Sequence, residues 1–134
     1  MNVSTTLNKL LFVIAGLYDG ALGIAFLFFA PSLFQHYQVT PPNHLGYVQF
    51  PALILIVFGV MFLRIASDPR RFRDMIPFGM GLKVAYAGIV FYYALTSGIP
   101  SMWLPWAWGD SVFLLLFVAA WTSLGAPRLT ERVA

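Results

Sequence analysis

The sequence contains no cysteine and very little charge. Without cysteine, the chain forms no disulfide, carries out no thiol chemistry and offers no thiolate to a metal ion. Only 10% of its 134 residues are charged and 60% are hydrophobic, whereas a soluble domain carries about a quarter charged residues. So few charges cannot cover a surface in water, and we therefore expect a lipid bilayer to surround most of the chain.

Long apolar runs make up most of the sequence. A helix needs about 20 apolar residues to cross the hydrocarbon core of a bilayer. The runs that meet this requirement are Leu10–Ala30, about Tyr47–Ile65, about Ile76–Leu95 and Trp106–Leu124. The first run is about twice as long as the apolar region of a signal peptide, and we predict that it is retained. The sequence thus predicts an all-α fold, a four-transmembrane-helix bundle that forms one integral membrane domain over residues 1–134.

Prolines indicate where the predicted helices begin or bend. Asp68-Pro69 and Thr40-Pro41 each pair a capping residue with proline, which is favoured at the first position of a helix. We therefore expect the third and second helices to begin at these two sites, and Pro105 to lie in the first turn of the fourth. Pro51 and Pro77 fall inside predicted helices, and we expect each to kink its helix.

Positive charges outside the predicted helices lie on one side of the membrane. The two connections over residues 31–46 and 96–105 contain no lysine or arginine. Basic residues instead lie near the chain ends and between the second and third helices: Lys9, Arg64, Arg70, Arg71, Arg73, Arg128 and Arg132. Because cytoplasmic loops are enriched in lysine and arginine, we predict that both termini are cytoplasmic.

The opposite side of the membrane carries most of the tryptophan and tyrosine. These residues are Trp103, Trp106, Trp108, Tyr37, Tyr47, Tyr92 and Tyr93. Such rings concentrate at membrane interfaces, so the pattern predicts an aromatic belt at the outer surface. In a second interpretation, some of these rings line the entrance of a ligand site.

Three charged residues, Asp19, Lys83 and Asp110, lie inside the apolar runs. Because a charge at the bilayer centre costs roughly 2.5–3.5 kcal/mol on insertion scales, each is a candidate functional residue. At 1.5 Å of rise per residue, Asp19 lies roughly 13 Å from the cytoplasmic end of its helix, and Lys83 lies at a similar depth. We therefore predict an Asp19–Lys83 ion pair near the middle of the membrane.

Small residues surround both members of the predicted pair. The first helix carries Gly16, Gly20 and Gly23, and the third carries Gly81, Ala85 and Gly88, at spacings of three and four. Faces of this kind allow helices to pack backbone to backbone in lipid. We expect the first and third helices to pack closely, and in a purely structural interpretation the ion pair does no more than lock them together.

Asp110 is predicted to lie about one turn inside the fourth helix, nearer the outer surface. We expect Gln49 to reach a comparable depth, and Tyr92 or Tyr93 to donate a hydrogen bond to Asp110. The long stem of Lys83 allows its ammonium to extend towards Asp110 as well. In the structural interpretation, Asp110 only stabilises the positive end of the helix dipole.

These groups together predict a polar site that opens to the outer face, with Tyr18 and Tyr86 near its floor. The candidate ligand-binding residues are Asp19, Lys83, Asp110, Gln49, Tyr18 and Tyr86. His36 and His44 lie on the outer connection without a neighbouring carboxylate, so we predict no metal site and no cofactor. Membrane topology accounts for the basic residues, so we expect no nucleic-acid partner.

Four short motifs resemble a known group of membrane proteins. They are Tyr18-Asp19-Gly20, Asp68-Pro69-x-Arg71, Gly81-Leu82-Lys83 and Gly109-Asp110. Together they resemble small bacterial DoxX-like proteins with four helices, from about Leu17 to Leu124. The resemblance implies a four-helix bundle in a bacterial inner membrane. It implies no activity, because the chain supplies no redox centre like that of the quinone-reducing thiosulfate enzyme for which DoxX proteins are named.

The sequence leaves three functions open. We favour a non-catalytic protein, either monomeric or oligomeric, that binds a small amphipathic or lipidic ligand or a partner membrane subunit. The second is a proton-coupled exporter, because an acidic residue in the first of four short helices resembles the small multidrug resistance family; Lys83 is a departure from that family. The third is an intramembrane isomerase or hydrolase of an apolar substrate, with Asp110 and Lys83 as acid and base.

Overall fold

The computed structural model describes residues 3–125, and these are helical apart from short connections. In chain order the elements are α1 (Val3–Phe28), α2 (Ala30–His36), α3 (Gly46–Ser67), the 3₁₀ helix η1 (Arg73–Met75), α4 (Ile76–Leu95), the 3₁₀ helix η2 (Ser101–Trp103) and α5 (Leu104–Leu124). The helices α1, α3, α4 and α5 are long and apolar enough to cross a membrane. The predicted all-α bundle is confirmed, and the chain is a small multi-pass membrane protein.

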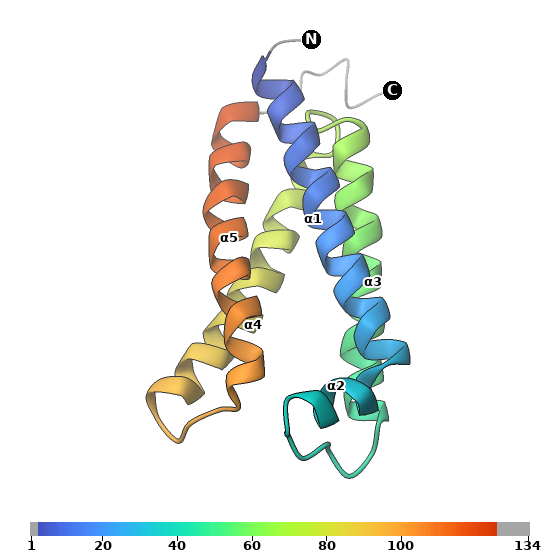
Figure 1. Ribbon diagram of the computed structural model, residues 1–134. Coiled ribbons are helices and arrows are strands. Elements are labelled where there is room, and N and C mark those ends of the chain that lie inside the picture. The colour runs from blue at the N-terminus through green and yellow to red at the C-terminus, as the bar shows by residue number, and fades with distance from the viewer. Residues whose placement is uncertain (1–2, 126–134) are drawn as a thin grey trace.

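The connection expected over residues 31–46 contains a helix that the sequence analysis did not predict. The helix α1 ends at Phe28, and α2 starts two residues later with Pro31 in its first turn. Proline has no N–H and its ring clashes with the carbonyl four residues earlier, so Pro31 favours a break in the helix. The chain therefore changes direction here, and Figure 1 shows α2 at the foot of α1.

Two of the predicted helix starts are wrong. Asp68-Pro69 does not begin a helix: Asp68 follows the last residue of α3, and α4 begins at Ile76 after a turn and η1. In that turn the Asp68 carboxylate accepts a hydrogen bond from the Arg71 backbone N–H at 3.3 Å, which is a local turn contact. Thr40-Pro41 is likewise separated from α3, which begins at Gly46.

The prolines within and near the long helices fall into two groups. Pro105 lies in the first turn of α5, as predicted. Pro77 also lies in a first turn, that of α4, so the prediction of an internal kink there is wrong. A first-turn proline costs no hydrogen bond, because its missing N–H would have no partner within the helix. Pro51 lies inside α3, as expected.

The four long helices form two hairpins. In Figure 1, α1 runs beside α3 and α4 runs beside α5. The start of α1, the end of α5 and the connection that carries the arginines lie at one end of the bundle. We call this the arginine end. The opposite end carries α2 and the connection between α4 and α5, and the two hairpins diverge towards it.

Polar contacts hold the arginine end together. The Asn8 side-chain amide of α1 donates a hydrogen bond to the Ser123 hydroxyl of α5 at 3.2 Å. Arg73 donates a hydrogen bond from Nε to the Trp121 carbonyl at 2.9 Å, and its guanidinium lies 3.5 Å from the centre of the Trp121 ring. An arginine on an aromatic face gains a cation–π attraction. These contacts attach α1 and the arginine-bearing connection to α5.

The small-residue face of α1 packs against α3, and not against α4 as predicted. A Cβ added at Gly59 of α3 would lie 2.9 Å from the Gly16 carbonyl oxygen, and one at Gly23 would lie 2.6 Å from the Ala52 carbonyl oxygen. By contrast, Gly81 and Gly88 of α4 have open space around them. Small residues thus bring two backbones together within the first hairpin, while the small face of α4 remains exposed.

We expect Gly59→Ala to destabilise the protein by about 1–3 kcal/mol, because the new methyl group meets rigid backbone on α1. Gly88→Ala is the matched control on α4. It adds the same methyl group in open space, and the higher helix propensity of alanine should leave stability unchanged or slightly raised. Thermal unfolding of both variants in detergent measures the difference. Equal melting temperatures would show that the α1–α3 contact tolerates a wider separation.

Candidate functional site

The Lys83 ammonium lies between two carboxylates in the middle of the bundle. Its Nζ atom is 2.9 Å from both Oδ1 and Oδ2 of Asp19, and 3.0 Å from Oδ1 of Asp110. Lys83 is 0% exposed, Asp19 is 1% exposed and Asp110 is 5% exposed. The predicted Asp19–Lys83 ion pair is therefore confirmed, and Lys83 does reach Asp110. We call these three residues the charged cluster.

The charged cluster joins the two hairpins. Asp19 belongs to α1 in the first hairpin, while Lys83 and Asp110 belong to α4 and α5 in the second. The helices α1 and α4 do not run in contact along their lengths, so the Lys83 side chain bridges the space between them. The expectation of a packed interface between these helices is thus wrong, although their charged residues do meet.

Aromatic rings enclose the Lys83 ammonium beyond its carboxylate partners. Nζ lies 5.1 Å from the ring centre of Phe113, 5.5 Å from that of Tyr18 and 5.7 Å from that of Phe62. Ring faces within about 6 Å attract a cation, and more strongly where water is excluded. Carboxylates and ring faces therefore surround the ammonium together.

A stack of phenylalanines closes the bundle between the charged cluster and the arginine end. Phe12, Phe62 and Phe117 come from α1, α3 and α5 and are all 0% exposed. The Phe12 and Phe117 ring centres are 5.0 Å apart, and those of Phe62 and Phe117 are 5.1 Å apart. We call these three rings the phenylalanine plug. It fills the space between the hairpins on this side of the cluster.

A pocket of about 740 Å³ lies on the other side of the charged cluster, towards α2. Asp19 and Asp110 both line it, whereas Lys83 does not. Nearly all the rest of its wall is hydrocarbon and aromatic, contributed by α1, α2, α3, α4, η2 and α5 and by the connections between them. The pocket is thus an apolar chamber with two carboxylates at one end.

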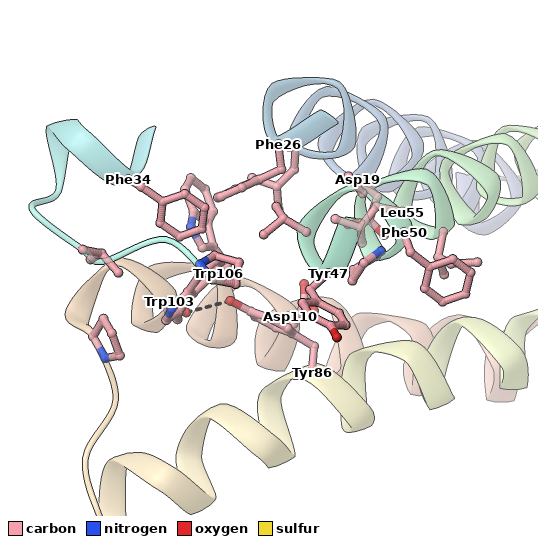
Figure 2. Close-up of a pocket in the computed structure, with 18 of the residues that line it drawn as sticks. Asp19, Phe26, Phe34, Tyr47, Phe50, Leu55, Tyr86, Trp103, Trp106 and Asp110 are labelled. Carbon is pink, nitrogen blue, oxygen red and sulfur yellow. Dashed lines mark hydrogen bonds between the residues drawn. The ribbon is translucent and has the colours of Figure 1, made fainter. Parts of the chain in front are cut away.

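Aromatic side chains form the far end of the pocket. Figure 2 shows Phe26, Phe34 and Trp103 gathered there, and the Trp103 ring centre lies 5.5 Å from that of Phe26 and 6.1 Å from that of Phe34. The Tyr86 hydroxyl donates a hydrogen bond to the Trp103 carbonyl at 3.0 Å, which ties α4 to η2. Trp103 and Trp106 line the pocket, while Trp108 is 64% exposed. At the end of the bundle opposite the arginine end, some aromatic rings therefore face outward and others line the pocket.

The remaining predicted site residues divide between the pocket and the surface. Tyr86 lines the pocket. Tyr18 lies behind the cluster, where its hydroxyl sits over Gly109 and its ring contacts Trp106 and Phe113. Gln49 is exposed and lies outside the pocket wall.

Two tyrosines and two histidines predicted near the outer surface make only local contacts. Tyr92 and Tyr93 are exposed and contact each other, so neither donates the predicted hydrogen bond to Asp110. His44 Nδ1 accepts a hydrogen bond from the Gly46 backbone N–H at 2.9 Å, at the start of α3. The His36 ring lies against Tyr37. Among residues 3–125, no group of three or more histidine, cysteine, aspartate or glutamate side chains is arranged to hold a metal ion.

The sequence analysis missed the walls of the pocket, although a signal for part of them exists. Leu22 and Phe26 follow Asp19 by three and seven residues, and such spacings place side chains on the same face of a helix. From this spacing alone, Leu22 and Phe26 could have been predicted to line the site on its outer side. Phe34 could not, because its position depends on the turn between α1 and α2.

Comparisons with protein-family models, with curated proteins and with solved structures find no match for this chain. The resemblance to DoxX-like proteins therefore stays a prediction that rests on the four short motifs.

We expect Lys83→Met to lower the free energy of unfolding by about 3–5 kcal/mol, because it leaves two buried carboxylates without their cation. Adding Asp19→Asn to this variant should recover part of the loss by removing one of the stranded charges. Lys9→Met, at the only other lysine in the chain, is the control, with a change within about 0.5 kcal/mol. Unfolding by SDS in mixed micelles measures all three. A Lys83→Met variant as stable as the control would show that the cluster does not hold the hairpins together.

Proposed function

We propose that the protein binds a small amphipathic molecule in the pocket between its two hairpins, and that it does so without catalysis. The polar head of the ligand lies against Asp19 and Asp110, and its apolar part lies among the hydrocarbon and aromatic walls. The observation that carries the proposal is the pocket itself, of about 740 Å³ with a polar group at only one end. Ligand pockets are typically about 300–1,000 Å³, mainly apolar, with a few polar groups that orient the ligand.

The position of the pocket supports a ligand that comes from the membrane. Its wall includes Tyr47 and Phe50 of α3, which are 70% and 67% exposed, so the pocket reaches the outside of the bundle beside them. The helices α3 and α4 make few contacts with each other, and the hairpins to which they belong diverge away from the arginine end (Figure 1). A molecule dissolved in the bilayer therefore has a route into the pocket between these two helices.

The contacts of Lys83 favour binding over the alternatives. Its Nζ atom contacts oxygens of both Asp19 and Asp110 and is shielded from the pocket, so it does not reach a bound molecule as a base would have to. Asp19 is engaged through both of its oxygens, which disfavours it as the carrier of a transported proton. A partner subunit would need an exposed surface, whereas the charged cluster is enclosed.

The proposal includes a location and an orientation. We place the protein in a bacterial inner membrane as a DoxX-like protein, with the arginine end and both termini in the cytoplasm. The support is the clustering of Arg64, Arg70, Arg71 and Arg73 near that end.

We expect Leu55→Trp to obstruct ligand binding, because Leu55 lines the pocket and the larger ring projects into it. Leu53→Trp is the matched control: it makes the same change on the same helix at a residue that is 48% exposed and outside the pocket wall. Native mass spectrometry of gently extracted protein should show a bound small molecule on the wild type and the control, and none on Leu55→Trp. A ligand that stayed on all three proteins would contradict binding in this pocket.

The absence of cysteine allows a direct test of orientation. We expect Ser97→Cys, in the connection between α4 and α5, to react with a membrane-impermeant maleimide in intact bacterial cells. Ser67→Cys, at the end of α3, should react only after the cells are lysed. Labelling is read as a mass shift on a gel. The reverse pattern would place the arginine end outside the cell.

A further inference from the structure

The charged cluster turns acceptors, and not donors, towards the pocket. A lysine ammonium has three N–H groups. The Nζ atom of Lys83 contacts Asp19 Oδ1, Asp19 Oδ2 and Asp110 Oδ1, and Lys83 is 0% exposed and does not line the pocket. A ligand in the pocket therefore finds no free donor on this lysine, although the lysine is the only cation in the cluster.

One carboxylate oxygen of the cluster remains available. No residue of the described chain donates a hydrogen bond to Asp110 Oδ2, and Asp110 is 95% buried yet lines the pocket. This oxygen is not itself fully buried, so a group in the pocket can reach it. A ligand that carries a donor could therefore bond to it.

The charge balance of the cluster points the same way. When both carboxylates are ionised, Asp19 and Asp110 carry two negative charges against the single positive charge of Lys83. The remaining negative charge lies in an apolar surrounding, where an unpaired charge is strongly disfavoured. A positive charge that enters from the pocket side would balance it.

We propose that the ligand is a lipophilic cation, a protonated amine on an apolar body, whose ammonium donates a hydrogen bond to Asp110 Oδ2. This inference rests on the proposed binding function and specifies its ligand class. Such a bond is charge-assisted on both sides and is about twice as strong as a neutral one. Fatty acids and other anionic amphiphiles are excluded, because their heads would meet carboxylates instead of the lysine.

The experiment compares three probes with the same twelve-carbon tail in nanodiscs of phosphatidylcholine at neutral pH: dodecylamine, dodecanol and dodecanoic acid. Binding is measured by native mass spectrometry. The Leu55→Trp variant, whose pocket is obstructed, gives the background from each probe dissolved in the lipid. Specific binding is the excess on the wild type over this background.

We expect specific binding in the order amine, alcohol, acid. Asp110→Asn should weaken the amine about tenfold, since it replaces the charged acceptor of the ammonium by a neutral amide, and should change the alcohol much less. Asp74→Asn is the matched control: it removes one negative charge from an exposed residue of η1, outside the pocket wall, and should leave both affinities unchanged. The comparison of probes on the wild type does not depend on the folding of Asp110→Asn.

The outcomes separate the two proposals. Specific binding of the acid at least as tight as that of the amine overturns the cationic ligand and leaves amphiphile binding standing. The same holds if Asp110→Asn and Asp74→Asn weaken the amine equally. If none of the three probes binds the wild type above the background of Leu55→Trp, amphiphile binding itself is wrong.

Discussion

The fold depends on the placement of one ammonium between carboxylates of two hairpins. Lys83 bonds to Asp19 across the bundle and to Asp110 within its own hairpin, at distances of 2.9 to 3.0 Å. None of these charges is stable alone in hydrocarbon, where an uncompensated ion costs several kcal/mol. Because the helices α1 and α4 are not otherwise packed together, this contact fixes how far apart the hairpins stand at the level of the cluster.

The interior is densely packed on one side of the charged cluster and open on the other, and the pocket lies on the open side. Towards the arginine end, the rings of Phe12, Phe62 and Phe117 fill the interior. Towards α2 the hairpins diverge, and the aromatic side chains line a pocket instead of closing it. Asp19 and Asp110 thus have the lysine on one side and the chamber on the other, so the groups that stabilise the bundle also form the polar end of the pocket.

The sequence predicted the spanning helices and the ion pair because both follow from properties that act along one helix. A run of about twenty apolar residues indicates a helix that crosses the bilayer. Two opposite charges at the same depth in the bilayer are expected to pair, because each is costly there alone. Which helices pack together does not follow in this way. The glycines of α1 show that another backbone can come close, but only the structure shows that Gly59 of α3 provides it. The exposed position of Gln49 and the turn at Pro31 also depend on tertiary contacts. The lengths of the apolar runs carry no information about such contacts.

The divergence of the hairpins makes the two ends of the pocket unequal. The phenylalanine plug and the hydrogen bonds of Asn8 and Arg73 hold the bundle together near the arginine end. Phe34 and Trp103 lie far from these contacts, whereas Asp19 and Asp110 lie beside the plug. A change in the angle between the hairpins would therefore alter the width of the aromatic end of the pocket much more than the geometry of its acidic end.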